Sequence, residues 1–247
     1  MKRIPILIII VFLIAFLSCE QDNTNPSVSN PIVVELDTFI VNNYIEDAKS
    51  LYFHEIITDI YHPNYNNPII DTAEVTKVLM IIQAVYNLNS PERDTIFEIH
   101  EIHGHFCYSF QSISLNVKTE LPEIQNLSNN IIPTGDSGLD HLLSTYQFDS
   151  VKTSYSYPSF PWLTIYTQDE YNMIPLEREF SDLPQILIAE FNKGCIGDGN
   201  TISLIRNSDS ATITFSIGWG DCPAGCIFHK YWEFEVRNGV AEFIRVY

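Results

Sequence analysis

The spacing of apolar residues predicts two amphipathic helices in the first third of the chain. Between residues 36 and 60, apolar side chains recur every three or four positions, as on one face of a helix: Leu36, Ile40, Tyr44, Ala48, Leu51, Tyr52, Ile56 and Ile60. A second apolar stripe runs from Val75 to Tyr86. Asp71 and Glu74 precede it as a helix cap with its acidic partner, and Asn89-Ser90-Pro91 ends it.

The segment from Thr95 to Val117 has the composition of strands, but its alternation changes phase. Phe97 and Ile99 are apolar at odd positions, whereas the later apolar positions are even: Ile102, Phe106, Tyr108 and Phe110. A shift of one residue turns the apolar set to the other face of a strand. The change of phase therefore predicts a bulge or a hairpin at Gly104.

Four shorter elements are predicted in the middle of the chain. A short helix covers 139–146, and strands are expected at 151–157 and 163–167 around an aromatic turn that contains prolines. Ser181 is then expected to cap a further helix. That helix should end at Lys193-Gly194, because a basic residue followed by glycine is a common helix end.

The last 50 residues carry the clearest strand pattern. Apolar and polar positions alternate from Ala211 to Ile217 and from Trp232 to Arg237, as expected of strands with one wet face. Asn238-Gly239 predicts a tight hairpin into a last strand at 240–247. We therefore predict an α+β fold, with N-terminal helices followed by a C-terminal helix packed on about four antiparallel strands.

The first 18 residues have the organisation of an export signal. Lys2 and Arg3 precede an apolar run from Ile4 to Leu17, which is shorter than the ~20 residues that span a bilayer. The run ends at Ser18-Cys19, which resembles the lipobox of bacterial lipoproteins. Cys19 is therefore the expected lipid-bearing N-terminus of the mature protein. The alternative is an uncleaved membrane anchor.

A tether and two folded regions complete the predicted organisation. Residues 19–33 are polar and contain two prolines, a composition that buries no core and is typical of a flexible linker. Residues 34–175 form a helical and strand N-terminal region, and 176–247 form the C-terminal helix and sheet, unless both are one continuous domain. The expected location is the bacterial cell envelope, with the lipid in the outer membrane and the protein on its periplasmic or surface face.

The charge balance excludes two classes of partner. The chain has 13 basic and 31 acidic residues, and its formal net charge is −18. The predicted signal contains two of the basic residues and none of the acidic ones, so the mature protein is more acidic still. Such a charge repels nucleic acid and anionic lipid head groups. The N-terminal lipid is therefore the expected contact with the membrane, where several acyl chains give stable attachment.

Four cysteines remain besides Cys19, and an even number outside the cytoplasm favours disulfides. Cys222 and Cys226 flank Pro-Ala-Gly, which makes a turn and favours a local bridge. Cys195 bonded to one of these two is the alternative, and Cys107 completes the set. Cys222 with His229 does not predict a cysteine nucleophile, because Cys226 offers a disulfide four residues away.

The densest group of possible metal ligands is His100, His103, His105 and Cys107. On a continuous strand, His103, His105 and Cys107 share a face at a spacing that zinc sites use. A hairpin at Gly104 would separate them, and Cys107 is expected to be bonded or buried. The alternative is therefore that these residues are exposed polar positions of a strand and bind no metal. Residues 197–200 read as a turn and not as a calcium loop, because only two of their side chains qualify as ligands.

Aromatic residues crowd the segment from 155 to 171. Tyr155, Tyr157, Trp162 and Tyr166 are candidates for ligand binding, since exposed aromatic rings stack on sugars or anchor a protein partner. The alternative is that they belong to the core. No glycine-rich phosphate loop, GxSxG elbow or HExxH motif is present, and no cofactor or catalytic residue is implied.

The block Gly218-Trp219-Gly220-Asp221-Cys222-Pro223-Ala224-Gly225-Cys226, continued by Tyr231-Trp232-Glu233-Phe234, resembles one that recurs in exported bacterial proteins of uncharacterised function. That resemblance implies that the cysteine block matters to the fold or to a surface, and implies no activity. We expect a lipid-anchored envelope protein that acts as a non-enzymatic binding or structural module. The alternatives are a secreted inhibitor or a module that binds peptide or carbohydrate, and a metal-dependent hydrolase that uses the His103 cluster.

Overall fold

The computed structural model describes residues 35–247, so the predicted signal at 1–18, Cys19 and the tether at 19–33 lie outside the described residues. The helices are α1 (Thr38–Thr58), α2 (Thr72–Tyr86), α3 (Pro91–Asp94), α4 (Pro122–Ser128), α5 (Ser137–Thr145) and α6 (Met173–Ser181). The strands are β1 (Ser112–Val117), β2 (Phe148–Thr153), β3 (Trp162–Thr167), β4 (Ile186–Glu190), β5 (Thr201–Arg206), β6 (Ala211–Trp219), β7 (Phe228–Arg237) and β8 (Val240–Val246). Within 35–247, no helix combines the length and hydropathy of a membrane-spanning segment.

The N-terminal helices begin at side-chain caps. The carboxylate of Asp37 accepts a hydrogen bond from the backbone N–H of Phe39 and starts α1. Asp71 accepts from the N–H groups of Ala73 and Glu74 and starts α2, as its sequence predicts. The carboxylate of Glu74 does not return to the cap, because it is hydrogen-bonded to Arg206.

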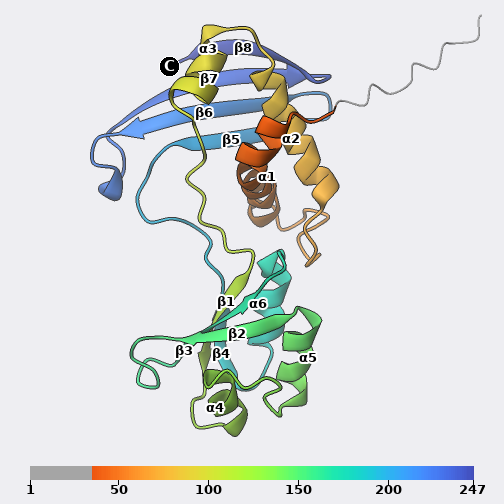
Figure 1. Ribbon diagram of the computed structural model, residues 1–247, viewed down its shortest axis with the longest axis vertical. Helices are drawn as coiled ribbons and strands as arrows, with labels where there is room; N and C mark the ends of the chain where they lie inside the picture. Colours follow the sequence, from red (N-terminus) through yellow and green to blue (C-terminus); the bar gives the residue numbers. More distant parts are fainter. Residues whose placement is uncertain (1–34) are drawn as a thin grey trace, which may run out of the picture. The chain divides into compact units, whose positions relative to one another are not determined.

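The first sheet has the strand order β2-β3-β1-β4, and all its pairs are antiparallel. Its buried positions alternate with half-buried ones along β1 and β3, so only one face meets the core. The helices α4, α5 and α6 contact this sheet (Figure 1). On the core face, the rings of Phe148 and Phe180 lie 5.6 Å apart.

The second sheet is an antiparallel meander in the order β5-β6-β7-β8. The helices α1 and α2 contact its strands and cover one face (Figure 1). Asn238 and Gly239 have positive φ angles of 51° and 75°, which is the geometry of the predicted tight hairpin between β7 and β8. The predicted α+β class, with a helix-covered antiparallel sheet of four strands at the C-terminus, is confirmed.

The helix that we predicted from Ser181 to Lys193 is wrong. Ser181 ends α6, and Ile186–Glu190 is strand β4, which pairs with β1 in the first sheet. A short apolar run fits a buried helix or a strand equally well by periodicity. The helices on the C-terminal sheet therefore come from the start of the described chain.

The strand-like interpretation of 95–111 is also wrong. Thr95–Ile99 forms a π-helical turn that continues α3, and β1 begins only at Ser112. Ser90 accepts a hydrogen bond from the N–H of Arg93. Pro91 occupies the first helical turn, where backbone N–H groups have no partner within the helix, so its missing N–H costs no hydrogen bond. These start signals override the apolar alternation that follows them.

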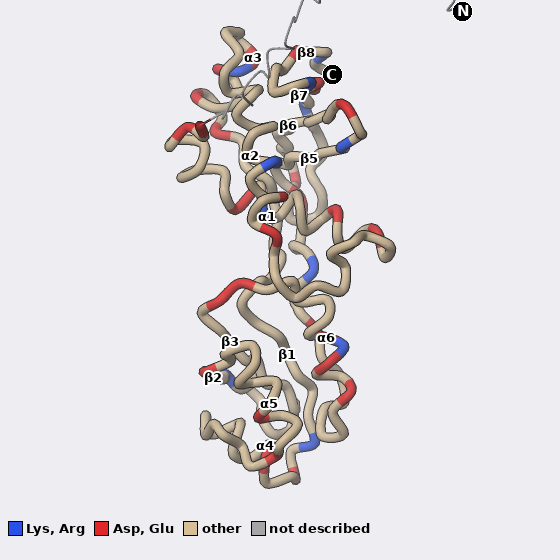
Figure 2. Tube along the Cα trace, turned by 90° about the vertical axis from the view of Figure 1, so that its right-hand side faces the viewer, with Lys and Arg blue, Asp and Glu red and all other residues tan. Residues whose placement is uncertain are grey.

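Several contacts join the layers around the two sheets. The guanidinium of Arg206 on β5 contacts the carboxylates of Glu55 on α1 and Glu74 on α2 at 2.9 and 2.7 Å. The buried amide of Asn172 donates to three backbone carbonyls between residues 64 and 67. Figure 2 shows that acidic positions are spread over helices, strands and loops of the described residues.

Candidate functional site

Trp162 and Tyr166 lie on β3 and point away from the core. They alternate with Leu163, Ile165 and Thr167, which are buried. Because successive side chains of a strand point to opposite faces, Trp162, Thr164 and Tyr166 share the face that α4–α6 do not cover. We call this surface the outer face of the first sheet.

The strand register places polar side chains beside these rings. Trp162 pairs with Asn116, Thr164 with Ser114 and Tyr166 with Ser112. The hydroxyl oxygens of Ser114 and Thr164 lie 3.1 Å apart. The outer face therefore consists of three rows across the strands: Ser150–Tyr166–Ser112, Lys152–Thr164–Ser114–Glu190 and Trp162–Asn116–Ile188.

Two contacts orient the rings. The Lys152 ammonium lies 5.0 Å from the ring centre of Tyr166, a cation–π distance. The ring of Phe160, in the turn between β2 and β3, lies 6.2 Å from Trp162. The strand β2 ends at Thr153, so Tyr155 and Tyr157 lie in that turn and not on a strand. Tyr155 is fully exposed, whereas Tyr157 packs partly against the core.

A pocket of about 500 Å³ lies between α1, α2 and the segments around Ile69 and Glu170. Four of its ten lining residues are aliphatic, and the exposed lining surface is mostly apolar, with Lys49 at one side. The Lys49 ammonium contacts Glu46 at 2.6 Å and Glu170 at 2.8 Å. Because these carboxylates already pair with Lys49, the pocket offers a ligand mostly apolar contact.

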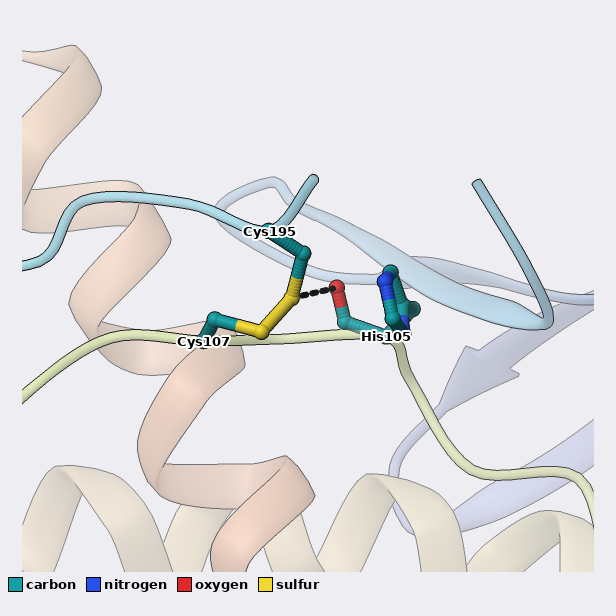
Figure 3. A group of neighbouring side chains, drawn as sticks. All are labelled: His105, Cys107 and Cys195. Atoms are coloured by element: carbon teal, nitrogen blue, oxygen red, sulfur yellow. Dashed lines mark hydrogen bonds between the residues drawn. A yellow bond between two sulfur atoms is a disulfide. The ribbon is translucent and has the colours of Figure 1, made fainter. Parts of the chain in front are cut away.

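The structure brings two of the three predicted metal ligands together: ligand atoms of His105 and Cys107 lie within 4.8 Å of each other and of Cys195, whereas His103 has a different partner. Cys107 is disulfide-bonded to Cys195, so its sulfur is not a thiolate (Figure 3). The carbonyl oxygen of His105 lies 3.4 Å from the Sγ of Cys195. This contact is not a true hydrogen bond, because the disulfide-bonded sulfur carries no hydrogen. His103 is hydrogen-bonded to Asp47.

The pairing of Asp47 with His103 crosses 56 residues of sequence. Asp47 on α1 is buried, and its two oxygens contact Nδ1 of His103 and the N–H of Gly104, both at 2.7 Å. The hydrogen bond to Asp47 raises the pKa of His103 above its usual value, although desolvation opposes it. The imidazole also stacks on Tyr44 at 4.7 Å. Among the hydrogen bonds of residues 35–247, none joins His103 to a hydroxyl or thiol nucleophile, so this pair anchors the segment that leads to β1.

Two segments far apart in sequence meet at the second disulfide, which joins Cys222 to Cys226, the local pairing favoured by the sequence. We call residues 195–200 and 218–229 together the cysteine corner. The N–H of Asp198 donates to the carbonyl of Cys222 at 2.9 Å, and the Asp198 carboxylate accepts from the N–H of Cys226 at 3.3 Å. The same carboxylate lies 3.1 Å from Nε2 of His229.

The glycines of the cysteine corner permit this close approach. A Cβ on Gly197 would lie 2.9 Å from the carbonyl oxygen of Cys222, and the residue has a positive φ of 84°. A Cβ on Gly218 would lie 2.6 Å from the Sγ of Cys226. The His105 segment joins the corner too, since its N–H donates to the carbonyl of Asn200. Sequence reasoning treated these blocks separately, and their shared place became visible only in the fold.

Comparison with protein-family models, with curated proteins and with solved structures finds no match to this chain. The resemblance of the cysteine block to exported bacterial proteins therefore stays a prediction.

Proposed function

We propose that the chain is a lipid-anchored protein of the bacterial cell envelope that binds carbohydrate without transforming it. The export signal and Cys19 support the location. One structural observation carries the binding activity: the register that sets Trp162 and Tyr166 beside Thr164, Ser114 and Asn116 on one outer face.

This arrangement suits sugar chemistry. A pyranose ring has an apolar C–H face that packs on an aromatic ring, and its hydroxyls exchange hydrogen bonds with hydroxyl and amide side chains. Trp162 and Tyr166 are four residues apart on β3, which is about 13 Å along a strand. One sugar ring cannot bridge that distance, so the outer face suits an oligosaccharide.

The charge of the protein limits which oligosaccharide it would bind. A formal net charge of −18 repels polyanions at low ionic strength. Glu190 lies at the margin of the outer face, in the row of Lys152 and Thr164. A neutral or amino-sugar chain is therefore the expected ligand class.

Binding of the purified protein to a panel of neutral, amino and anionic oligosaccharides tests the proposal. Trp162→Ala should weaken binding to the best ligand by about tenfold or more, since a well-placed aromatic contact contributes ~1–2 kcal/mol. Trp219→Ala is the matched control, because Trp219 is 46% exposed on the second sheet and stacks on Phe228. Absence of carbohydrate binding, or equal losses in both variants, contradicts the proposal. A peptide ligand in place of a sugar would support the alternative class.

The anchor has a separate test. Mass spectrometry of the protein from its native membrane should find acyl chains on Cys19 and no residue before it. Cys19→Ser should release the protein from the membrane fraction, because the lipid supplies the attachment. Recovery of an intact N-terminus at Met1 would support an uncleaved anchor.

A further inference from the structure

Four side chains of the cysteine corner have the chemistry of zinc ligands. Ligand atoms of Asp198, Cys226 and His229 all lie within 4.8 Å of one another. Cys222 does not belong to that group, but its sulfur is bonded to that of Cys226. Zinc in proteins takes four ligands from thiolate, imidazole and carboxylate groups, at about 2.0–2.3 Å. Such ligands lie about 3.5 Å apart, so Asp198, Cys226 and His229 need only small movements to surround one ion. The Cys222 sulfur can take the fourth position only after its bond to Cys226 is broken.

The corner also contains a polar atom without a partner. Nδ1 of His229 is buried and has no hydrogen-bond partner among the described residues. Nε2 of the same ring faces the Asp198 carboxylate, so Nε2 is the atom that would bind an ion there, and Nδ1 remains without a bonded partner. Asp198, by contrast, is held in place by the N–H groups of Gly199 and Cys226. A preorganised carboxylate and an incompletely bonded imidazole thus flank the disulfide.

We infer that the cysteine corner binds one Zn²⁺ when the Cys222–Cys226 disulfide is reduced. A dithiol reductant supplies the two electrons and two protons: its own sulfurs become a disulfide, the S–S bond breaks and two thiols form. Zinc then displaces the two thiol protons and forms two Zn–S bonds, completed by Asp198 and His229. The disulfide and the zinc complex are alternative states of the same corner.

The local spacing of the cysteines favours this site. Cys222 and Cys226 are four residues apart, within the C-x₂₋₄-C range of zinc sites. Reduction leaves them close, because the short loop between them costs little entropy to close. The hydrogen bonds of Asp198 with the backbone of Cys222 and Cys226 do not depend on the S–S bond.

The other disulfide is a built-in comparison. His105, Cys107 and Cys195 also lie close together, but they offer three ligands and not four. Cys107 and Cys195 are 88 residues apart, so reduction removes a long-range crosslink. That site should therefore lose its geometry when its sulfurs become available.

The test is zinc titration of the full-length protein with and without a phosphine reductant, which does not bind zinc strongly. All proteins in the test carry Cys19→Ser, so that Cys107→Ser/Cys195→Ser retains only the cysteines of the cysteine corner and Cys222→Ser/Cys226→Ser retains only the other pair. The reduced first variant should bind one Zn²⁺, and the second should bind at least about 100-fold more weakly. Neither should bind stoichiometric zinc when oxidised. Cobalt in place of zinc should show thiolate-to-metal absorption in the first variant alone.

Single variants assign the remaining ligands. His229→Gln and Asp198→Asn should each lower zinc affinity by about tenfold or more, whereas His105→Gln should not change it. Circular dichroism of each reduced variant checks that the sheet persists. Failure of the folded, reduced cysteine corner to bind zinc overturns the inference, as does equal binding by both double variants. Carbohydrate binding at the outer face is a separate readout, so either proposal can fail alone.

Discussion

The two sheets have the same strand number and differ in how the chain assembles them. The strands of the second sheet follow one another along the chain, whereas the first sheet has the order β2-β3-β1-β4. In the first sheet, β1 and β4 pair across about 70 residues of intervening sequence. Pairing two strands that are neighbours in the sequence closes only a short loop, whereas pairing strands that are distant in the sequence depends on the packing of the chain between them. Local patterns therefore specify the second sheet far better than the first.

Their outward faces differ as well. On the second sheet, Glu233 pairs with Arg245 at 3.0 Å, and the ring of Tyr247 contacts both the Tyr231 ring and the Arg245 guanidinium. These outward side chains already contact one another. On the outer face of the first sheet, Tyr166 lies in a row with two serines and Trp162 in a row with Asn116, and the two rings contact Lys152 and Phe160 respectively. Rings beside uncharged polar side chains support the proposal of carbohydrate binding at the first sheet, whereas the second sheet has an ion pair at the corresponding place.

The largest expected effect comes from creating a cavity in the core beside either sheet. Phe234 on β7 and Phe180 on α6 are both fully buried, and they belong to one continuous hydrophobic core. Phe234→Ala and Phe180→Ala should each lower the free energy of unfolding by about 3–5 kcal/mol. Urea denaturation measures the loss, and hydrogen exchange of β1 and β6 locates it. Acceleration confined to the mutated sheet would show that the sheets unfold separately.

A smaller loss is expected from breaking the ion pairs between β5 and the helices. Arg206→Ala leaves the partly buried carboxylates of Glu55 and Glu74 without their cation and should cost about 1–3 kcal/mol. Arg245→Ala is the matched control on the same sheet. Its side chain is 61% exposed, so solvent screens its pair with Glu233 and the substitution should change the urea midpoint little. Equal urea midpoints for the two variants would show that the ion pairs of Arg206 do not stabilise the packing of α1 and α2 on β5.

The hairpin of the second sheet should show a purely conformational effect. Gly239 has a φ of 75°, and a Cβ there would meet no atom within 4 Å. Gly239→Ala should therefore destabilise by about 1 kcal/mol through backbone strain alone. Gly194→Ala adds a Cβ in equally open space without a positive φ, so its thermal midpoint should stay close to that of the wild type. A comparable loss in both would contradict the local origin of the effect.

The smallest expected effect is a pH dependence of the connection that leads to β1. The hydrogen bond to Asp47 raises the pKa of His103 in the folded state. The stabilisation should be complete below the unfolded pKa of about 6.5 and should decline as pH rises through the folded value. His103→Asn keeps a neutral donor and does not titrate. The stability difference between wild type and His103→Asn should therefore shrink from pH 5 to 9, and a constant difference would refute the assignment.

The sequence by itself determined the elements whose signals are local. The stripes of α1 and α2, the Asp71 cap and the Asn238-Gly239 hairpin are specified by neighbouring residues. The alternation in β6 and β7 likewise reports one buried face, whatever covers it. Trp162 and Tyr166 were identifiable as candidates for the same reason, since their spacing places both on one side of a strand.

Only the tertiary structure decided the rest. The apolar run in β4 has no periodicity of its own, and its pairing with β1 makes it a strand. His103 is a candidate metal ligand in the sequence, and its pairing with Asp47 becomes visible only when α1 packs beside the segment before β1. The cysteine corner joins two blocks through Asp198, a contact that no spacing within either block encodes. The periodicity of a segment shows which side of a helix or strand is buried, but only the packing shows which other element covers that side.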